Sequence, residues 1–101
     1  VRPTSALGVT RASLDEIFLP EGLKSIGRFA FYRCTRLTDI HLPDGLQSIE
    51  DNAFRNCTSL SQVHLPEGLE SIKNNAFTNC TSLSQIHLPG GLQSIGRSTF
   101  D

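Results

Sequence analysis

The sequence has few of the features that mark several large classes of protein. No apolar run approaches the ~20 residues that a helix needs to cross a bilayer. Lysine and arginine number nine and aspartate and glutamate ten, so composition indicates neither nucleic acid nor an anionic membrane as a partner. Three cysteines are an odd number and too few for a disulfide-stapled secreted domain. A chain of 101 residues is then one domain, or part of one.

The N-terminus also lacks the marks of a secretion signal. Its first ten residues, VRPTSALGVT, contain no continuous apolar segment and do not begin with methionine. We therefore expect the chain to derive from a longer one, by processing or by truncation. Any signal would lie upstream, so the sequence itself leaves the cellular compartment open.

What the sequence does contain is repetition. Cutting the chain before each Leu-Pro pair gives three full units of 23 residues, the last two of which are identical at 17 of 23 positions. A partial unit lies on each side. We therefore expect a single domain, 1–101, made of a partial repeat 1–18, full repeats 19–41, 42–64 and 65–87, and a partial repeat 88–101.

The apolar residues of each unit recur in the same columns. In the second unit these columns are Leu42, Leu46, Ile49, Ala53, Phe54, Cys57, Leu60 and Val63. Eight columns in 23 residues account for nearly all of the 38% hydrophobic content of the chain. Because no single unit can bury its own apolar face, this pattern predicts a solenoid in which each unit packs against the next.

The end of each unit is predicted to be a strand. Apolar and polar residues alternate there, as in Val63, His64 and Leu65, which is typical of a strand with one buried face. A proline follows and ends the strand because it has no N–H for the ladder, and the glycine two residues on permits a turn. Stacking the units puts these strands parallel, in register and ~4.8 Å apart. The predicted strands cover 14–19, 37–42, 60–65 and 83–88.

The rest of each unit is expected to be less regular. The segment GLQSI should return in an extended or irregular path. The segment NAFRNC is too short for a long helix and is expected to form one helical turn on the outer side.

The unit resembles a known repeat. Its pattern, LPxGLxxIxxxAFxxCxxLxxIxL, is similar to the BspA-like leucine-rich repeat over residues 14 to 100. The resemblance implies an α/β repeat fold: a right-handed solenoid with a parallel β-sheet on its concave side and short helical turns on its convex side. It also implies cell-surface or secreted proteins of bacteria and some parasitic protists, used in adhesion and in binding host proteins. The pattern fails at the ends, where Gly8, Arg11 and Thr99 replace the expected Phe, Cys and Ala.

Two columns are candidates for a binding face. Successive residues of a strand point to opposite sides, so the residues beside the buried aliphatics should face outward on the concave sheet. They form an aromatic column and a polar column that is acidic near the N-terminus and neutral further on. Rings give contact area and amides give directional hydrogen bonds, which suits a protein partner, although recent duplication of the unit would produce the same columns. The predicted contact residues are Glu16, Phe18, Asp39, His41, Gln62, His64, Gln85 and His87.

The histidines and cysteines are not predicted to hold a metal. Three imidazoles in a straight row at ~4.8 Å steps cannot easily converge on one ion, although two adjacent rings could, and no carboxylate set is placed by the sequence to complete a tetrahedron. Cys34, Cys57 and Cys80 form one column, without the local spacing of zinc sites, and are expected to pack in the core as small apolar residues. We expect no cofactor.

The same repetition argues against an enzyme. A catalytic site needs a nucleophile, a base and an orienting group that converge, whereas each candidate group here recurs along a line. Arg28, Arg33 and Arg36 gather on the outer side of the first unit, where a solvated surface is the simpler interpretation. We therefore expect a non-catalytic module that binds a protein or another macromolecule, without nucleic acid and without membrane insertion.

The two ends of the chain favour an alternative function, that of a structural protein that assembles with itself. Residues 88–101 and 10–18 together amount to one 23-residue unit, so two chains could complete a composite repeat head to tail. Such a protein would form homo-oligomers or filaments through uncapped ends. Truncation of a longer array explains the same ends.

Overall fold

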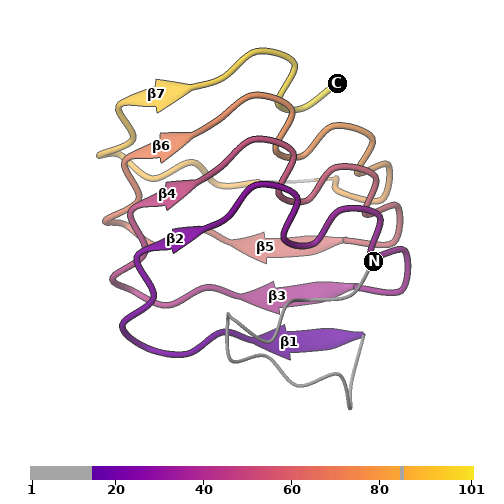
Figure 1. The fold of residues 1–101 in the computed structure, drawn as a ribbon, viewed down its shortest axis with the longest axis horizontal. Helices are drawn as coiled ribbons and strands as arrows, with labels where there is room; N and C mark the ends of the chain where they lie inside the picture. The colour runs from indigo at the N-terminus through magenta and orange to yellow at the C-terminus, as the bar shows by residue number, and fades with distance from the viewer. Residues whose placement is uncertain (1–14, 85) are drawn as a thin grey trace.

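The chain forms stacked turns with two parallel sheets. The computed structural model describes residues 15–84 and 86–101. Figure 1 shows successive turns lying one above another, with one sheet on each of two sides. The first sheet, in the order β1–β3–β5, contains Glu16–Phe18, Asp39–His41 and Gln62–His64. The second, in the order β2–β4–β6–β7, contains Ser25–Ile26, Ser48–Ile49, Ser71–Ile72 and Ser94–Ile95.

Strand register confirms the 23-residue repeat. Ile17 pairs with Ile40, and Ile40 pairs with Val63, in parallel ladders of the first sheet. In the second sheet Ile49 pairs with Ile72 in the same way. Each side chain therefore lies beside its counterpart in the next unit, as the translation of identical units requires. The handedness of the coil and the concavity of the first sheet stay predictions.

Three of the four predicted strands are present, each shortened to three residues. They are β1, β3 and β5, which lie inside the predicted ranges 14–19, 37–42 and 60–65. The fourth range, 83–88, contains Gln85, which lies outside the described residues, and the described residues of that range form no strand.

The second sheet was not predicted. Its strands are Ser-Ile pairs from the segment expected to return irregularly. Two residues are too few to show an alternation, so the sequence pattern carries no strand signal there. Stacking supplies the sheet, because equivalent pairs in successive turns lie side by side and satisfy each other's backbone groups.

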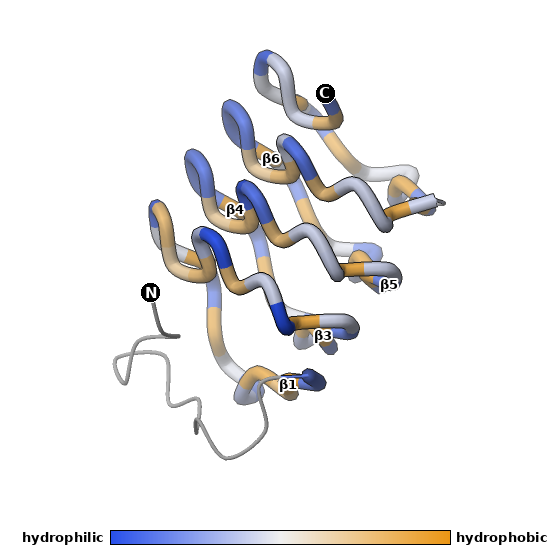
Figure 2. The backbone as a smooth tube through the Cα atoms, turned by 90° about the vertical axis from the view of Figure 1, so that its right-hand side faces the viewer, coloured by the Kyte–Doolittle hydropathy of each residue, from blue (hydrophilic) through white to orange (hydrophobic). Residues whose placement is uncertain are grey.

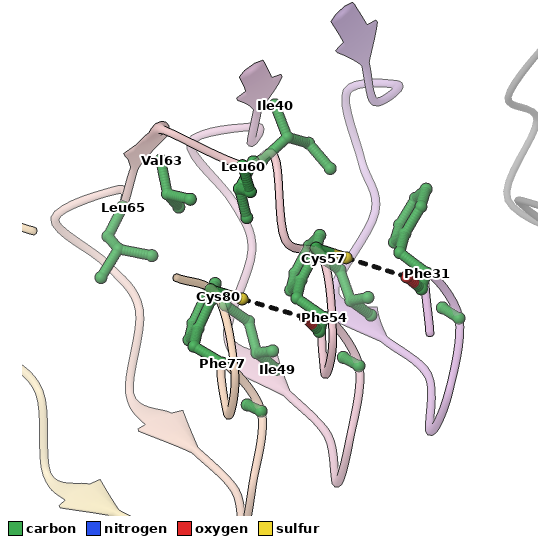
Figure 3. Close-up of a cluster of buried hydrophobic side chains, with 14 of the residues drawn as sticks. Phe31, Ile40, Ile49, Phe54, Cys57, Leu60, Val63, Leu65, Phe77 and Cys80 are labelled. Atoms are coloured by element: carbon green, nitrogen blue, oxygen red, sulfur yellow. Dashed lines mark hydrogen bonds between the residues drawn. The ribbon is translucent and has the colours of Figure 1, made fainter. Parts of the chain in front are cut away.

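Repeated apolar columns fill the space between the two sheets. Figure 2 shows hydrophobic segments recurring at the same place in each turn. Phe31, Phe54 and Phe77 are at most 1% exposed and stack in a row, with ring centroids 5.2 Å apart and planes within 3°. Phe100 continues the row at 5.8 Å but is 42% exposed. Seven of the eight columns predicted for the second unit are thus buried, Leu42 is half-buried, and a continuous aromatic stack runs along the solenoid axis (Figure 3).

The predicted helical turns are not confirmed. None of the described residues forms a helix, so none of them belongs to a helix that could cross a membrane. In the second unit, N–H groups alternate between a carbonyl three residues back and a carbonyl in the next turn. Ala53 and Arg55 donate to Glu50 and Asn52, whereas Phe54 donates to Ala76 in the following turn.

Residues with positive φ produce this alternation. Asn52, Asn56, Asn75 and Asn79 have φ between 61° and 65°. Such left-handed conformations reverse the direction of successive peptide groups, and asparagine tolerates them better than most residues. A helix would direct every N–H along its own axis and leave the next turn without these hydrogen bonds.

Equivalent positions in the first unit hold less suitable residues. Phe29 has φ 60° and Arg33 has φ 61°, where the next two units have asparagine. A bulky side chain in this conformation is strained. We therefore predict that Phe29→Asn and Arg33→Asn will each raise the free energy of unfolding by about 0.5–1 kcal/mol.

Urea denaturation followed by circular dichroism would measure this gain. Arg36→Ser is the matched control, since it also restores the residue of the later units, Ser59 and Ser82, but at a position without positive φ. Its effect should stay within about 0.5 kcal/mol. Equal effects of all three substitutions would contradict a backbone origin.

Candidate functional site

The outward face of the first sheet carries the predicted contact residues. Ile17, Ile40 and Val63, at the centres of β1, β3 and β5, are at most 6% exposed and face the core. Their neighbours in each strand face outward, as the alternation predicts. We call the described members of this set the exposed face: Glu16, Phe18, Asp39, His41, Gln62, His64 and His87. Gln85 was also predicted there but lies outside the described residues.

The aromatic column of the exposed face forms a stack. The rings of Phe18 and His41 have centroids 4.0 Å apart and planes within 2°. His41 and His64 follow at 6.2 Å and 20°. Phe18 is 67% exposed, so one side of this stack is open to a partner. The predicted row of rings is thus present for these three residues, and their role in binding stays a prediction.

Two carboxylates lie against His41. Its Nε2 is 2.8 Å from Glu16 Oε2, a hydrogen bond, and 3.6 Å from Asp39 Oδ2. The Glu16 contact crosses diagonally from β1 to β3, a distance that long side chains on neighbouring strands can span. These contacts fix the position of the imidazole on which Phe18 stacks, and they give this end of the face its acidic character.

The sequence placed no set of carboxylates beside the histidines, and the structure corrects that expectation. One donor atom each from Glu16, Asp39 and His41 lie within 4.8 Å of one another, so carboxylates are in fact placed beside a histidine. They could hold a cation only by replacing the bond between Glu16 and His41. Strand register brings Glu16 beside Asp39 and Phe18 beside His41, and the diagonal neighbour rule could have identified the cluster from the sequence.

A hollow of about 360 Å³ opens further along the same face. It lies between His64 and His87 and is also lined by Gln62 and Ser84. The described residues of 83–88 form no strand there, whereas His41 and His64 stand on paired strands. The sequence gives no sign of this hollow, because the repeat pattern predicts the same spacing at every step.

Cys57 and Cys80 lie in the core, as predicted, whereas Cys34 is half-buried and packs against it. Cys57 Sγ donates a hydrogen bond to the carbonyl of Phe31 at 3.0 Å, and Cys80 Sγ donates to that of Phe54 at 3.1 Å (Figure 3). Burial raises the pKa of Cys80 to about 11 and raises the pKa of Cys57 further. Both thiols are therefore protonated near neutral pH and are poor nucleophiles. Their hydrogen bonds link each turn to the one before.

Histidines and cysteines consequently do not converge. His41 and His64 stand on the outward face of the first sheet, whereas Cys57 and Cys80 are at most 8% exposed and belong to the core. Arg28, Arg33 and Arg36 are exposed on the first turn, outside the strands of both sheets.

Stacked 23-residue turns with a parallel sheet and buried leucine and isoleucine columns define a leucine-rich repeat protein. The family model for the BspA type leucine rich repeat region, in six copies, matches residues 9–101. The chain belongs to this family. Leucine-rich repeat proteins generally serve in protein binding.

Two solved structures are similar to this chain. One is a leucine-rich repeat protein from Bacteroides ovatus ATCC 8483, with 34% sequence identity and a TM-score of 0.77 over 84% of this chain and 23% of that one. The other is a leucine-rich repeat protein of T. pallidum, with 29% identity and a TM-score of 0.76 over 98% of this chain and 55% of that one. The chain thus spans about a quarter and about half of these two proteins. No curated protein matches it.

Proposed function

We propose that this chain is a non-catalytic binding module whose exposed face contacts a protein partner. The observation that carries the proposal is the flat stack of Phe18 on His41, open to solvent on one side. Aromatic rings held rigidly at a surface contribute strongly to protein interfaces, because they bury a large area with little loss of conformational freedom. The general use of leucine-rich repeats in protein binding supports the same function.

The charge of the exposed face also differs between its two ends, which would orient a partner. Glu16 and Asp39 make its N-terminal end acidic, while Gln62 further along is a neutral hydrogen-bonding group. A partner would therefore bind in one orientation, with its donor groups toward β1. Adhesion at a cell surface, or secretion, is the setting that we propose for this binding, with the first sheet as the concave side.

A matched pair of variants tests the face. Phe18→Ala, His41→Ala and His64→Ala combined should weaken binding to an identified protein partner by at least about tenfold, because they remove the whole stack. The control combines Gln47→Ala, Glu70→Ala and Gln93→Ala, which form one exposed column beside the second sheet. Biolayer interferometry against purified serum and extracellular-matrix proteins would supply the partner and measure both affinities.

The result could contradict the proposal in two ways. Equal losses in the two triple variants would show that the exposed face has no special role. Absence of binding to every protein of the panel would count against adhesion.

Exposed apolar residues of the last turn favour a second candidate, head-to-tail assembly. Ile95 is 45% exposed, whereas its counterparts Ile49 and Ile72 are fully buried by the turns that follow them. Another turn, from the same protein or from a second copy, would cover Ile95 and Phe100. This candidate predicts homo-oligomers that grow with concentration.

Light scattering over a hundredfold dilution would measure the assembly. If second copies cover the last turn, the mean mass should rise with concentration in the wild type and stay monomeric in Ile95→Lys. A constant monomer mass in the wild type would rule out assembly without affecting the proposed binding face.

A further inference from the structure

The first turn departs from the later ones on its outer side. Residues 28–33 read RFAFYR, where the equivalent segments of the next two turns read DNAFRN and NNAFTN. Only the buried Ala-Phe pair is shared. Arg28, Phe29, Tyr32 and Arg33 are the departures, and we call them the first-turn patch.

Each of three departures gives up a favourable interaction that the next two turns keep. Asp51 and Asn74, which follow Arg28 in their column, each accept a hydrogen bond through Oδ1 from the backbone N–H of the next turn, at 3.0 and 2.7 Å. Arginine has no acceptor and cannot do this. Phe29 and Arg33 occupy left-handed positions at which the two following turns have asparagine.

The first turn has no compensating burial. Phe29 is 43% exposed, and Arg28 and Arg33 are exposed as well. Strained backbone that persists at an exposed surface is typical of functional sites. The departures therefore point to a role outside the core.

The side chains of the patch are arranged as a contact surface. Phe29 packs edge to face on Tyr32, with ring centroids 5.2 Å apart. The Arg33 guanidinium carbon lies 6.0 Å from the centre of the Tyr32 ring. Two rings and one guanidinium group thus adjoin on one turn, and the exposed Arg28 precedes Phe29 in the chain. Phenylalanine, tyrosine and arginine are residues that interfaces concentrate.

The guanidinium groups in and beside the patch outnumber the carboxylates of the next turn. The nearest carboxylates of the second turn already accept hydrogen bonds within the fold, Asp51 from the backbone of Asn74 and Glu50 from Ser48 Oγ. Arg55, which follows Tyr32 in its column, adds a third cation beneath the patch and bonds to Asn52. Because the donors to Asp51 and Glu50 are neutral, both carboxylates keep their charge, and three guanidinium groups against two carboxylates leave one excess positive charge around the patch, on a chain whose net charge is −1.

We propose that the first-turn patch is a second binding site, which takes an acidic segment of a protein that also bears aromatic or aliphatic side chains. Guanidinium groups bind carboxylates through paired hydrogen bonds, and the two rings receive the apolar side chains of such a segment. The exposed face lies on the strands of the first sheet, so this site is separate from it and does not rest on its function.

A labelled peptide tests the site directly. The probe is a fluorescein-labelled peptide of about ten glutamates interrupted by two phenylalanines, titrated with the intact chain at about 50 mM salt, where charge attraction is weakly screened. Phe29→Asn combined with Arg33→Asn should weaken binding at least tenfold. The same double variant should unfold at higher urea concentration than the wild type, because it removes the left-handed strain.

This opposite response of binding and stability separates a functional site from a structural defect. Arg97→Asn is the matched control, since Arg97 occupies the column of Arg28 in the last turn, and it should change the affinity less than twofold. The triple variant of the exposed face should likewise bind the peptide normally.

Three results would overturn the proposal. The double variant could bind as tightly as the wild type, or the wild type could fail to bind the peptide. In the third case, heparin or an oligothymidylate would bind through Arg33 more tightly than the peptide, which would show that the partner is another class of polyanion.

Discussion

Each turn of this chain is held to the next by backbone hydrogen bonds between residues 22 to 24 positions apart. Ser61 donates to Thr38 in the first sheet, Glu50 to Ile26 in the second and Phe31 to Ala53 on the outer turn. Because these bonds occur on all sides of the coil, the turns cannot slip relative to one another. Every other property follows from that fixed translation: the phenylalanine stack, the thiol hydrogen bonds and the row of rings on the exposed face.

Translation by one unit also divides the side chains into core and surface by column. A column that faces inward must suit close packing at every turn, and Phe54, Ala53 and Cys57 are accordingly unexposed. A column that faces outward is free to change from turn to turn without cost to the core. Glu16, Asp39 and Gln62 change in this way, and so the chain can vary the chemistry of its exposed face along one axis while keeping its fold.

The left-handed positions are an exception to that freedom. They lie on the outer turn and are partly or fully exposed, yet their backbone conformation favours asparagine over bulkier residues. The first unit has Phe29 and Arg33 there, against that preference. Exposed residues that suit their backbone conformation poorly are the physical reason for proposing a binding site on the first turn.

Much of the fold could be predicted from the sequence, because a fixed repeat length shows which residues of successive turns lie side by side. Leu46, Phe54 and Cys57 recur every 23 residues, and this alone fixed which columns are buried, where the first-sheet strands lie and which way His41 and His64 face. The second sheet escaped prediction, since a Ser-Ile pair is too short to show a period. The outer turn was predicted as helical because residue patterns do not reveal the sign of φ, although paired asparagines at 52 and 56 are a signal for it.

The candidate site was less predictable than the fold. Its columns could be listed, but the bond between Glu16 and His41 depends on rotamers, and the hollow beside His87 depends on a local departure from the repeat. Neither feature can be predicted from the residue types that occupy a column. Repetition predicts what successive turns have in common, and the differences between them have to be observed.

The in-register stack is tested most directly by alanine at its centre and at its end. Phe54 contacts rings on both sides and is fully buried, whereas Phe100 contacts one and is 42% exposed. Phe54→Ala should lower the free energy of unfolding in urea by about 3–5 kcal/mol and Phe100→Ala by less than about 1.5 kcal/mol. Equal losses at the two positions would contradict a solenoid in which successive turns superimpose.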